Sequence, residues 1–277
     1  MFLRSSRRII YSVMILFYFI GSNHSIAAEP VKHPKLSFTT AGTLRFPYSL
    51  QPNDDSNVYL ESFFKAALPV WKTDKAKVSL FLRGFYSGDS QEFSFNNRSK
   101  ISVGVSYNRK ISRTLNISLD LQYDIDNRYT THQTQTGWRG RVSYFYYDNI
   151  WRNRPNGHKG WFRQNSWAKV WGVLTFPESL ADGNRNLAFI TGGELATAFV
   201  RPNSKLQYVP FVDLILAKDS YKLAANSKAI FGVGFKLRKS IKGGEISLGV
   251  KYAFDRRWTR GTTQSGVVVT GGWYKSF

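Results

Sequence analysis

The sequence predicts an all-β fold, an antiparallel transmembrane β-barrel of about 12 strands, preceded by a cleaved signal peptide. Three features of the chain predict it. A short apolar run follows basic residues at the N-terminus. Apolar and polar residues then alternate in segments of about ten residues, and the connections between these segments alternate between tight and long.

The first residues predict export through the inner membrane. Arg4, Arg7 and Arg8 precede the apolar run 9–21, which is shorter than a comfortable membrane helix, and residues 25–27 are suited to cleavage. An uncleaved anchor helix is the alternative. We expect a signal peptide over residues 1–27, a periplasmic tail over 28–35 and an outer-membrane β-barrel over 36–277.

The composition limits the possible partners. The chain has 277 residues, a formal net charge of +21 and 16% aromatic residues, and it stays strongly basic without the arginines of the signal peptide. This balance suggests contact with an anionic glycan, lipid headgroup or solute, whereas export excludes cytoplasmic nucleic acid. Cysteine is absent, so disulfides and thiolate metal sites are excluded.

Segment 114–124 shows the alternation most clearly. Its apolar residues fall on one side, and Asn116, Ser118, Asp120, Gln122 and Asp124 fall on the other. The same period of two predicts strands at 36–46, 57–66, 76–86, 98–108, 114–124, 137–150, 161–174, 187–201, 206–218, 227–238, 243–254 and 264–277.

A soluble β-sandwich would also show repeated short strands. Segments 100–107 and 244–254 favour the barrel, because small or polar residues such as Ser102 and Lys251 occupy every second position. This is expected where one side of a strand faces lipid and the other a wet lumen. We therefore expect the apolar side of segment 114–124 to face hydrocarbon and Asp120 to face water.

The lengths of the connections also favour the barrel, because outer-membrane barrels have tight turns in the periplasm and longer loops outside. Tight turns are predicted at 70–75, 109–113, 201–205 and 239–243, and longer loops at 47–56, 87–97, 124–136, 175–186, 219–226 and 255–263. The connection at 147–160 should be tight but looks long. Either its flanking strands extend further, or it forms a periplasmic excursion.

The chain ends on Phe277, which has Trp273, Val269 and Val267 on its side of the last segment. This ending resembles the signal that the barrel-assembly machinery recognises, although Lys275 stands where that pattern prefers an apolar residue. Aromatic residues near segment ends are expected at headgroup level on the lipid side: Tyr86, Tyr107, Tyr123, Tyr146 and Trp273.

The phase of each segment predicts which ionisable residues face the lumen. The basic ones are Arg45, Lys65, Lys77, Arg83, Lys100, Arg139, Arg141, Lys236, Arg238 and Lys251, and the acidic ones are Glu61, Asp120, Asp124, Glu194, Asp213 and Glu245. Unpaired charge in a narrow barrel is costly, so many should form ion pairs that brace the wall. The basic surplus would favour anions in a pore.

Two connections combine basic and aromatic residues. One has Arg152, Arg154, Lys159 and Arg163 with Trp151, Trp161 and Phe162, and the other has Arg256, Arg257 and Arg260 with Trp258. Tryptophan can stack on sugar rings while arginine pairs with carboxylate or phosphate, so an anionic polysaccharide is a sensible partner. Contact with the phosphates of outer-membrane lipid and lipopolysaccharide is the alternative.

The sequence does not indicate a catalytic site. Hydrolysis would need a Ser or Thr within reach of a histidine, and the mature chain has only His33, His132 and His158. His132 lies among threonines but lacks the signature of outer-membrane lipases. Metal-binding spacings and phosphate-binding loops are missing from the sequence as well. We expect no enzyme, no metal site and no cofactor.

The C-terminal third carries a resemblance to a known family. Stretches 186–199, 206–220, 229–258 and 266–277 resemble the terminal barrel of bacteriophage adsorption protein A, which is similar to barrels of exopolysaccharide-export outer-membrane proteins. The resemblance implies export of a surface polysaccharide, with outer loops that serve a phage as receptor. Such barrels normally follow helical repeats, which this chain lacks, so recruitment of periplasmic partners is not implied.

Three functions remain open at this point. The first is a pore or export conduit for an anionic solute or polymer, with surface polysaccharide preferred. The second is a closed barrel whose basic, aromatic outer loops bind glycan, lipid or phage. The third is an outer-membrane lipid hydrolase.

Overall fold

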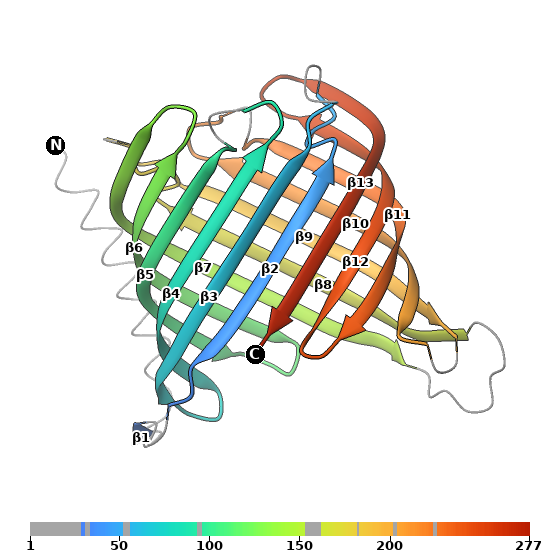
Figure 1. Ribbon diagram of the computed structural model, residues 1–277, viewed down its shortest axis with the longest axis horizontal. Helices are drawn as coiled ribbons and strands as arrows, with labels where there is room; N and C mark the ends of the chain where they lie inside the picture. Colours follow the sequence, from blue (N-terminus) through green and yellow to red (C-terminus); the bar gives the residue numbers. More distant parts are fainter. Residues whose placement is uncertain are drawn as a thin grey trace.

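The computed structural model describes residues 29–30, 34–51, 56–92, 96–152, 162–181, 183–201, 204–223 and 226–277. Figure 1 shows their strands tilted steeply around a common axis. Among these residues, no helix is long and apolar enough to cross a membrane.

Strands β2 to β13 close into one antiparallel barrel. Each pairs with its sequence neighbours, β2 pairs with β13, and the pairing of β3 with β4 completes the ring, while the two-residue β1 (Glu29–Pro30) lies beside β3. Closure pairs the backbone groups, which hydrocarbon could not satisfy. The barrel strands are β2 (Ser37–Phe46), β3 (Tyr59–Lys72), β4 (Ala76–Asp89), β5 (Arg98–Lys110), β6 (Leu115–Arg128), β7 (Gln133–Arg152), β8 (Phe162–Phe176), β9 (Ala188–Val200), β10 (Leu206–Asp219), β11 (Lys228–Ile241), β12 (Gly244–Arg257) and β13 (Thr262–Ser276).

The predicted inversion of polarity is confirmed. In β6, Leu121 is 56% exposed on the outside, whereas the next residue, Gln122, is 2% exposed and faces the interior. Strand β5 repeats the pattern, with Ile101 and Val103 exposed and Ser102 buried between them. A soluble sandwich would bury the apolar side chains instead, so this pattern excludes it.

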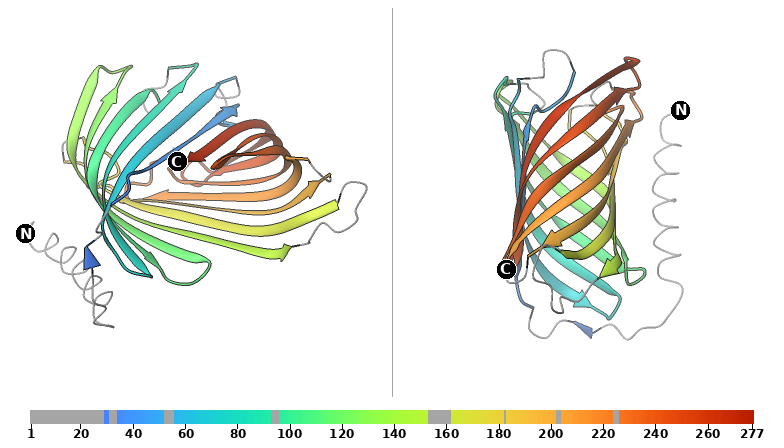
Figure 2. Two further views of the ribbon diagram at one scale, coloured as in Figure 1. Left: turned by 60° about the horizontal axis from the view of Figure 1, so that its bottom comes forward. Right: turned by 90° about the vertical axis from the view of Figure 1, so that its right-hand side faces the viewer.

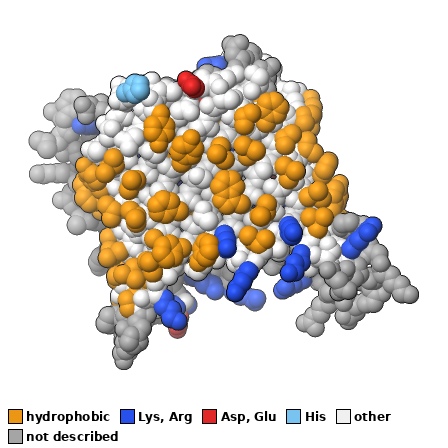
Figure 3. Space-filling model, viewed as in Figure 1, with side chains coloured by type: hydrophobic (Ala, Val, Ile, Leu, Met, Phe, Trp, Pro, Cys, Tyr) orange, Lys and Arg blue, Asp and Glu red, His pale blue; other side chains and the backbone are white. Residues whose placement is uncertain are grey.

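Apolar side chains form a band on the outer face. Figure 3 shows this band over much of one side, with Lys and Arg side chains gathered below it, towards the end where the chain terminates. The register places Arg109, Lys239 and Lys275 on the outer side near this end. Long basic side chains at such a border can reach lipid phosphates while their stems stay in hydrocarbon.

The aromatic residues expected at headgroup level also lie on the outer side of the wall. Register places Tyr86, Tyr107, Tyr123, Tyr146 and Trp273 there. The ring of Trp273 covers Gly42 of β2, where a side chain would overlap the indole. The last strand is therefore fitted against the first barrel strand by a glycine and an aromatic ring.

The tight turns lie where the sequence predicts them. Residues 73–75, 111–114, 201–205 and 242–243 connect strands at the end that carries the C-terminus, which we call the inner end (Figure 2). In outer-membrane barrels this end faces the periplasm. The opposite, outer end carries the connections 47–58, 90–97, 177–187 and 220–227.

Two of the predicted long loops are wrong. Strands β6 and β7 continue past the predicted segment ends, so only residues 129–132 connect them, and β12 and β13 are joined by 258–261. The inward–outward alternation of side chains continues beyond the predicted segment ends. Polar residues there, such as Asp126 and Asp255, pair within strands and face inward, so their polarity does not mark a loop. At the inner end β7 extends to Arg152, so a flanking strand of the 147–160 connection is longer than predicted, which was one of the two alternatives. The other alternative, a periplasmic excursion, falls on residues 153–161, which lie outside the described residues.

Candidate functional site: two cavities in a basic lumen

Each ionisable residue predicted to face the lumen lies on the inward side of its strand. Register brings Asp120 beside Arg141, and Lys100 beside Asp126, on the interior face. The same holds for the other predicted residues, namely Arg45, Glu61, Lys65, Lys77, Arg83, Asp124, Arg139, Glu194, Asp213, Lys236, Arg238, Glu245 and Lys251.

Ion pairs brace the wall, as expected. Arg139 Nη1 lies 2.8 Å from Asp124 Oδ2, and both side chains are almost fully buried. Lys251 Nζ lies 2.6 Å from Asp213 Oδ2, two strands away. The other pairs between strands join Arg83 with Asp120, Arg98 and Lys100 with Asp126, Lys169 and Lys236 with Glu194, and Arg238 with Glu245.

Part of the positive charge is left uncompensated. Among the described residues, Arg45, Lys65, Lys77 and Arg141 have no ion pair within 4.0 Å, and neither does Lys228. The acids of the lumen are mostly engaged by bases. The interior wall therefore carries a positive field that an incoming anion would meet.

A cavity of about 360 Å³, here called the outer cavity, lies in the lumen near the outer end. Glu178 is the acid among the described lining, and the basic lining residues are Arg83, Arg98, Lys100, Arg139, Arg141, Lys218 and Lys228. Asp120, Asp124 and Asp126 form ion pairs with bases of the lining, whereas Arg141 and Lys228 have no acidic group within 4.0 Å among the described residues. The cavity can therefore attract carboxylate or phosphate.

Two of the inward-facing basic residues at this cavity, Arg98 and Lys228, were missed from the sequence. Arg98 has the same strand phase as Lys100, and Lys228 has the phase of Lys236. Both begin a strand, at a segment boundary where the polar turn sequence hides the alternation. The predicted segments 98–108 and 227–238 already include both residues, so applying the phase to the first residues of each segment would have found them.

A second cavity of about 330 Å³, here called the inner cavity, lies nearer the inner end. Its lining combines four aromatic residues with four charged ones, namely Phe63, Phe85, Trp273 and Tyr274 with Glu61, Lys169, Lys236 and Glu245. Phe85 lines both cavities, so its ring lies where they adjoin. The guanidinium of Arg98 lies 5.6 Å from the centre of that ring.

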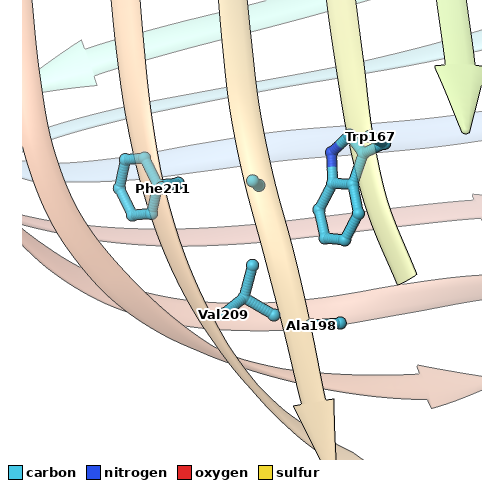
Figure 4. Packing of buried hydrophobic residues seen from close by; sticks show 5 residues of the cluster. Trp167, Ala198, Val209 and Phe211 are labelled. Carbon is cyan, nitrogen blue, oxygen red and sulfur yellow. The ribbon is translucent and has the colours of Figure 1, made fainter. Parts of the chain in front are cut away.

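The interior is less uniformly polar than predicted. Trp167, Ala198, Val209 and Phe211 form a buried apolar cluster on the inward side of β8, β9 and β10 (Figure 4). The Arg238 guanidinium lies 4.6 Å from the Trp167 ring centre, within the range of a cation–π contact. Apolar side chains therefore pack against one another on the lumen side of β8, β9 and β10.

The predicted loop-binding residues lie in different places. Arg256, Trp258 and Arg260 are exposed at the β12–β13 hairpin, and Trp258 is 46% exposed. Arg257 is wrongly predicted as a loop residue: it ends β12, faces inward and is 2.8 Å from Asp255. Arg152 ends β7, and Arg163 stacks on Trp151. Arg154, Lys159 and Trp161 lie outside the described residues.

One of the three histidines considered for hydrolysis lies among the described residues. His132 lies exposed in the β6–β7 turn, and its imidazole makes no hydrogen bond with a described residue. His33 and His158 lie outside the described residues. No group of three metal-ligating side chains occurs in the part of the chain that is described. The absence of an enzymatic role stays a prediction.

A scan against protein-family models and a search of curated proteins each found no match. Solved structures are similar at low identity. An outer membrane channel from Pseudomonas putida F1 is 7% identical, with a TM-score of 0.44 over 92% of this chain and 99% of that chain. LpxR from Salmonella typhimurium is 10% identical (TM-score 0.41; 86% and 99%), and the β domain of the Bordetella autotransporter BrkA is 13% identical (0.41; 88% and 99%).

These likenesses are too low to carry an argument about function. The assignment comes from the chain's own geometry: a closed wall, an apolar exterior and a charged interior. The chain is a bacterial outer-membrane β-barrel. Its resemblance to phage adsorption and polysaccharide-export barrels stays a prediction.

Proposed function

We propose that the barrel is a pathway across the outer membrane for an anionic solute. The outer cavity supports this most directly, because Arg141 and Lys228 line it without an ion-pair partner among the described residues. Basic residues in a pore lower the barrier to anions and raise their local concentration. The free charge faces the lumen, where a passing solute would meet it.

The finer part of the proposal is that the natural cargo is an acidic surface polysaccharide. Two adjoining cavities of about 360 and 330 Å³ suit consecutive units of a chain better than one isolated ion. The family resemblance in the C-terminal third points to the same cargo. Export through this pathway would place the polymer outside the cell, where lipopolysaccharide and other lipids surround the barrel.

Ion selectivity in planar bilayers tests the proposal. Under a KCl gradient, the reversal potential of the wild-type barrel should show chloride preference, and Arg141→Gln with Lys228→Gln should lower that preference several-fold. The matched control is Arg256→Gln, which removes a charge from the outer side of β12. Absence of conductance, or cation preference in the wild type, contradicts the proposal.

A second candidate is a closed barrel that binds glycan, lipid or phage through its outer surface. Exposed Trp258 beside Arg260 favours it, since an indole and a guanidinium together suit acidic sugars. The same bilayer measurement separates the two functions. A conduit keeps its conductance in Trp258→Ala with Arg260→Ala, whereas a closed receptor shows no conductance in any variant.

A further inference from the structure

Among the described residues, four aromatic side chains face the interior and are at least 36% exposed, and two of them lie at the inner cavity; the four are Phe63, Phe145, Tyr147 and Tyr274. Phe63 of β3 and Tyr274 of β13 lie on the inward side, yet they are 37% and 45% exposed. Both line the inner cavity. The neighbouring Phe64, by contrast, faces lipid, where its ring covers Gly84. Exposed rings gathered with polar groups around one cavity are a common feature of binding sites.

Polar groups surround these rings. Lys236 Nζ lies 2.7 Å from Glu194, and Lys169 shares the same carboxylate at 3.7 Å, so both cations sit at the cavity with hydrogen-bonding capacity to spare. Glu61 accepts a hydrogen bond from the Tyr59 hydroxyl at 2.9 Å and has no basic partner among the described residues. Ser247 adds a hydroxyl to the same lining.

We infer that the inner cavity is a binding site for the ring of a sugar. The apolar C–H face of a pyranose matches the exposed faces of Phe63 and Tyr274, and its hydroxyls match the surrounding ammonium, carboxylate and hydroxyl groups. A small inorganic anion would use the lysines but not the rings. The cavity therefore selects a saccharide.

The position of Phe85 extends this assignment to a chain of sugars. Because Phe85 lines both cavities, a ring held in the inner cavity has its next unit at the outer cavity, beside Arg141 and Lys228. An acidic unit there would be paired with those bases. The ligand class is thus an acidic oligosaccharide, and this step rests on the proposed function for the charge of the solute.

Titration calorimetry of the barrel in detergent micelles tests the inference without requiring conductance. The probes are a hyaluronan tetrasaccharide, in which acidic and neutral sugars alternate, and tetraglutamate, a polyanion without rings. We expect the wild type to bind the tetrasaccharide at least tenfold more tightly. Phe63→Leu with Tyr274→Leu should abolish this preference by weakening the tetrasaccharide alone, and Phe64→Leu, the matched control on the lipid side, should retain it.

Equal binding of the two probes to the wild type overturns the inference, and so does an equal loss in the Phe64→Leu control. Should the double variant fail to fold, Tyr274→Leu alone must weaken tetrasaccharide binding at least threefold, with Tyr274→Phe restoring it. If the barrel binds the tetrasaccharide but does not conduct, the sugar site is supported and the proposed transport function is contradicted. If it conducts anions but shows no preference for the tetrasaccharide, the transport function is supported and the sugar site is contradicted.

Discussion

Replacing Arg139 with Met is expected to destabilise the barrel by about 3–5 kcal/mol, the usual cost of removing one partner of a buried ion pair. Asp124 is fully buried behind Arg139, and Asp126 is buried on the same strand. Arg139 also donates to the carbonyl oxygens of Pro177 and Glu178 at 3.0 and 3.1 Å. The substitution therefore leaves the Asp124 carboxylate without its ion-pair partner and removes two hydrogen bonds to the loop whose Glu178 lines the outer cavity.

Urea unfolding in lipid vesicles, followed by tryptophan fluorescence, measures this loss. The matched control is Arg141→Met, two residues along the same face, because Arg141 has no ion pair among the described residues. We expect the control to change the free energy of unfolding by less than about 1 kcal/mol, since no carboxylate loses its partner. Equal effects of the two substitutions would show that the ion pairs do not hold the wall together.

Phe85→Ala is expected to raise the single-channel conductance about twofold or more, because pore diameter at the narrowest point limits flux. The ring of Phe85 lies where the two cavities adjoin, and Arg98 stands over it. Removing the ring joins the cavities into one space. Anion preference should persist, because the basic residues of the outer cavity are unchanged.

Single-channel recording gives both quantities in one experiment. Tyr86→Ala is the control, since Tyr86 is the next residue on β4 and faces lipid. Its conductance should match the wild type. If Phe85→Ala leaves the conductance unchanged, the two cavities do not lie in series along the path.

Alternation predicts the wall of this barrel well because each strand residue has only two choices of side. Hydrocarbon and a polar interior impose opposite requirements on those sides, so residues such as Leu121 and Gln122 settle the phase of β6 from the sequence alone. Strand ends were harder to place. Asp126 and Arg257 look like loop residues by composition, but they lie on the inward phase and are bound within the wall.

The site was predicted only in part, for a physical reason. A charged residue in the middle of a strand is expected to face the lumen, because a charge is unfavourable in hydrocarbon. Arg139 and Arg141 were therefore placed correctly. Aromatic residues suit lipid, the headgroup level and a sugar site alike, so type does not reveal their side. Adjacent Phe63 and Phe64 illustrate this: their residue type is the same, and only the phase set by Glu61 and Lys65 on the same strand separates the ring at the cavity from the ring in the membrane.

Thiol modification across the wall tests the central claim, a charged lumen that conducts. The chain has no cysteine, so Thr175→Cys, which lines the outer cavity, and its lipid-facing neighbour Leu174→Cys each supply a single thiol. We predict that a negatively charged methanethiosulfonate reagent lowers chloride preference at position 175, that a positively charged one raises it, and that neither acts at position 174. Equal effects at both positions, or a current insensitive to charge at position 175, would contradict the account.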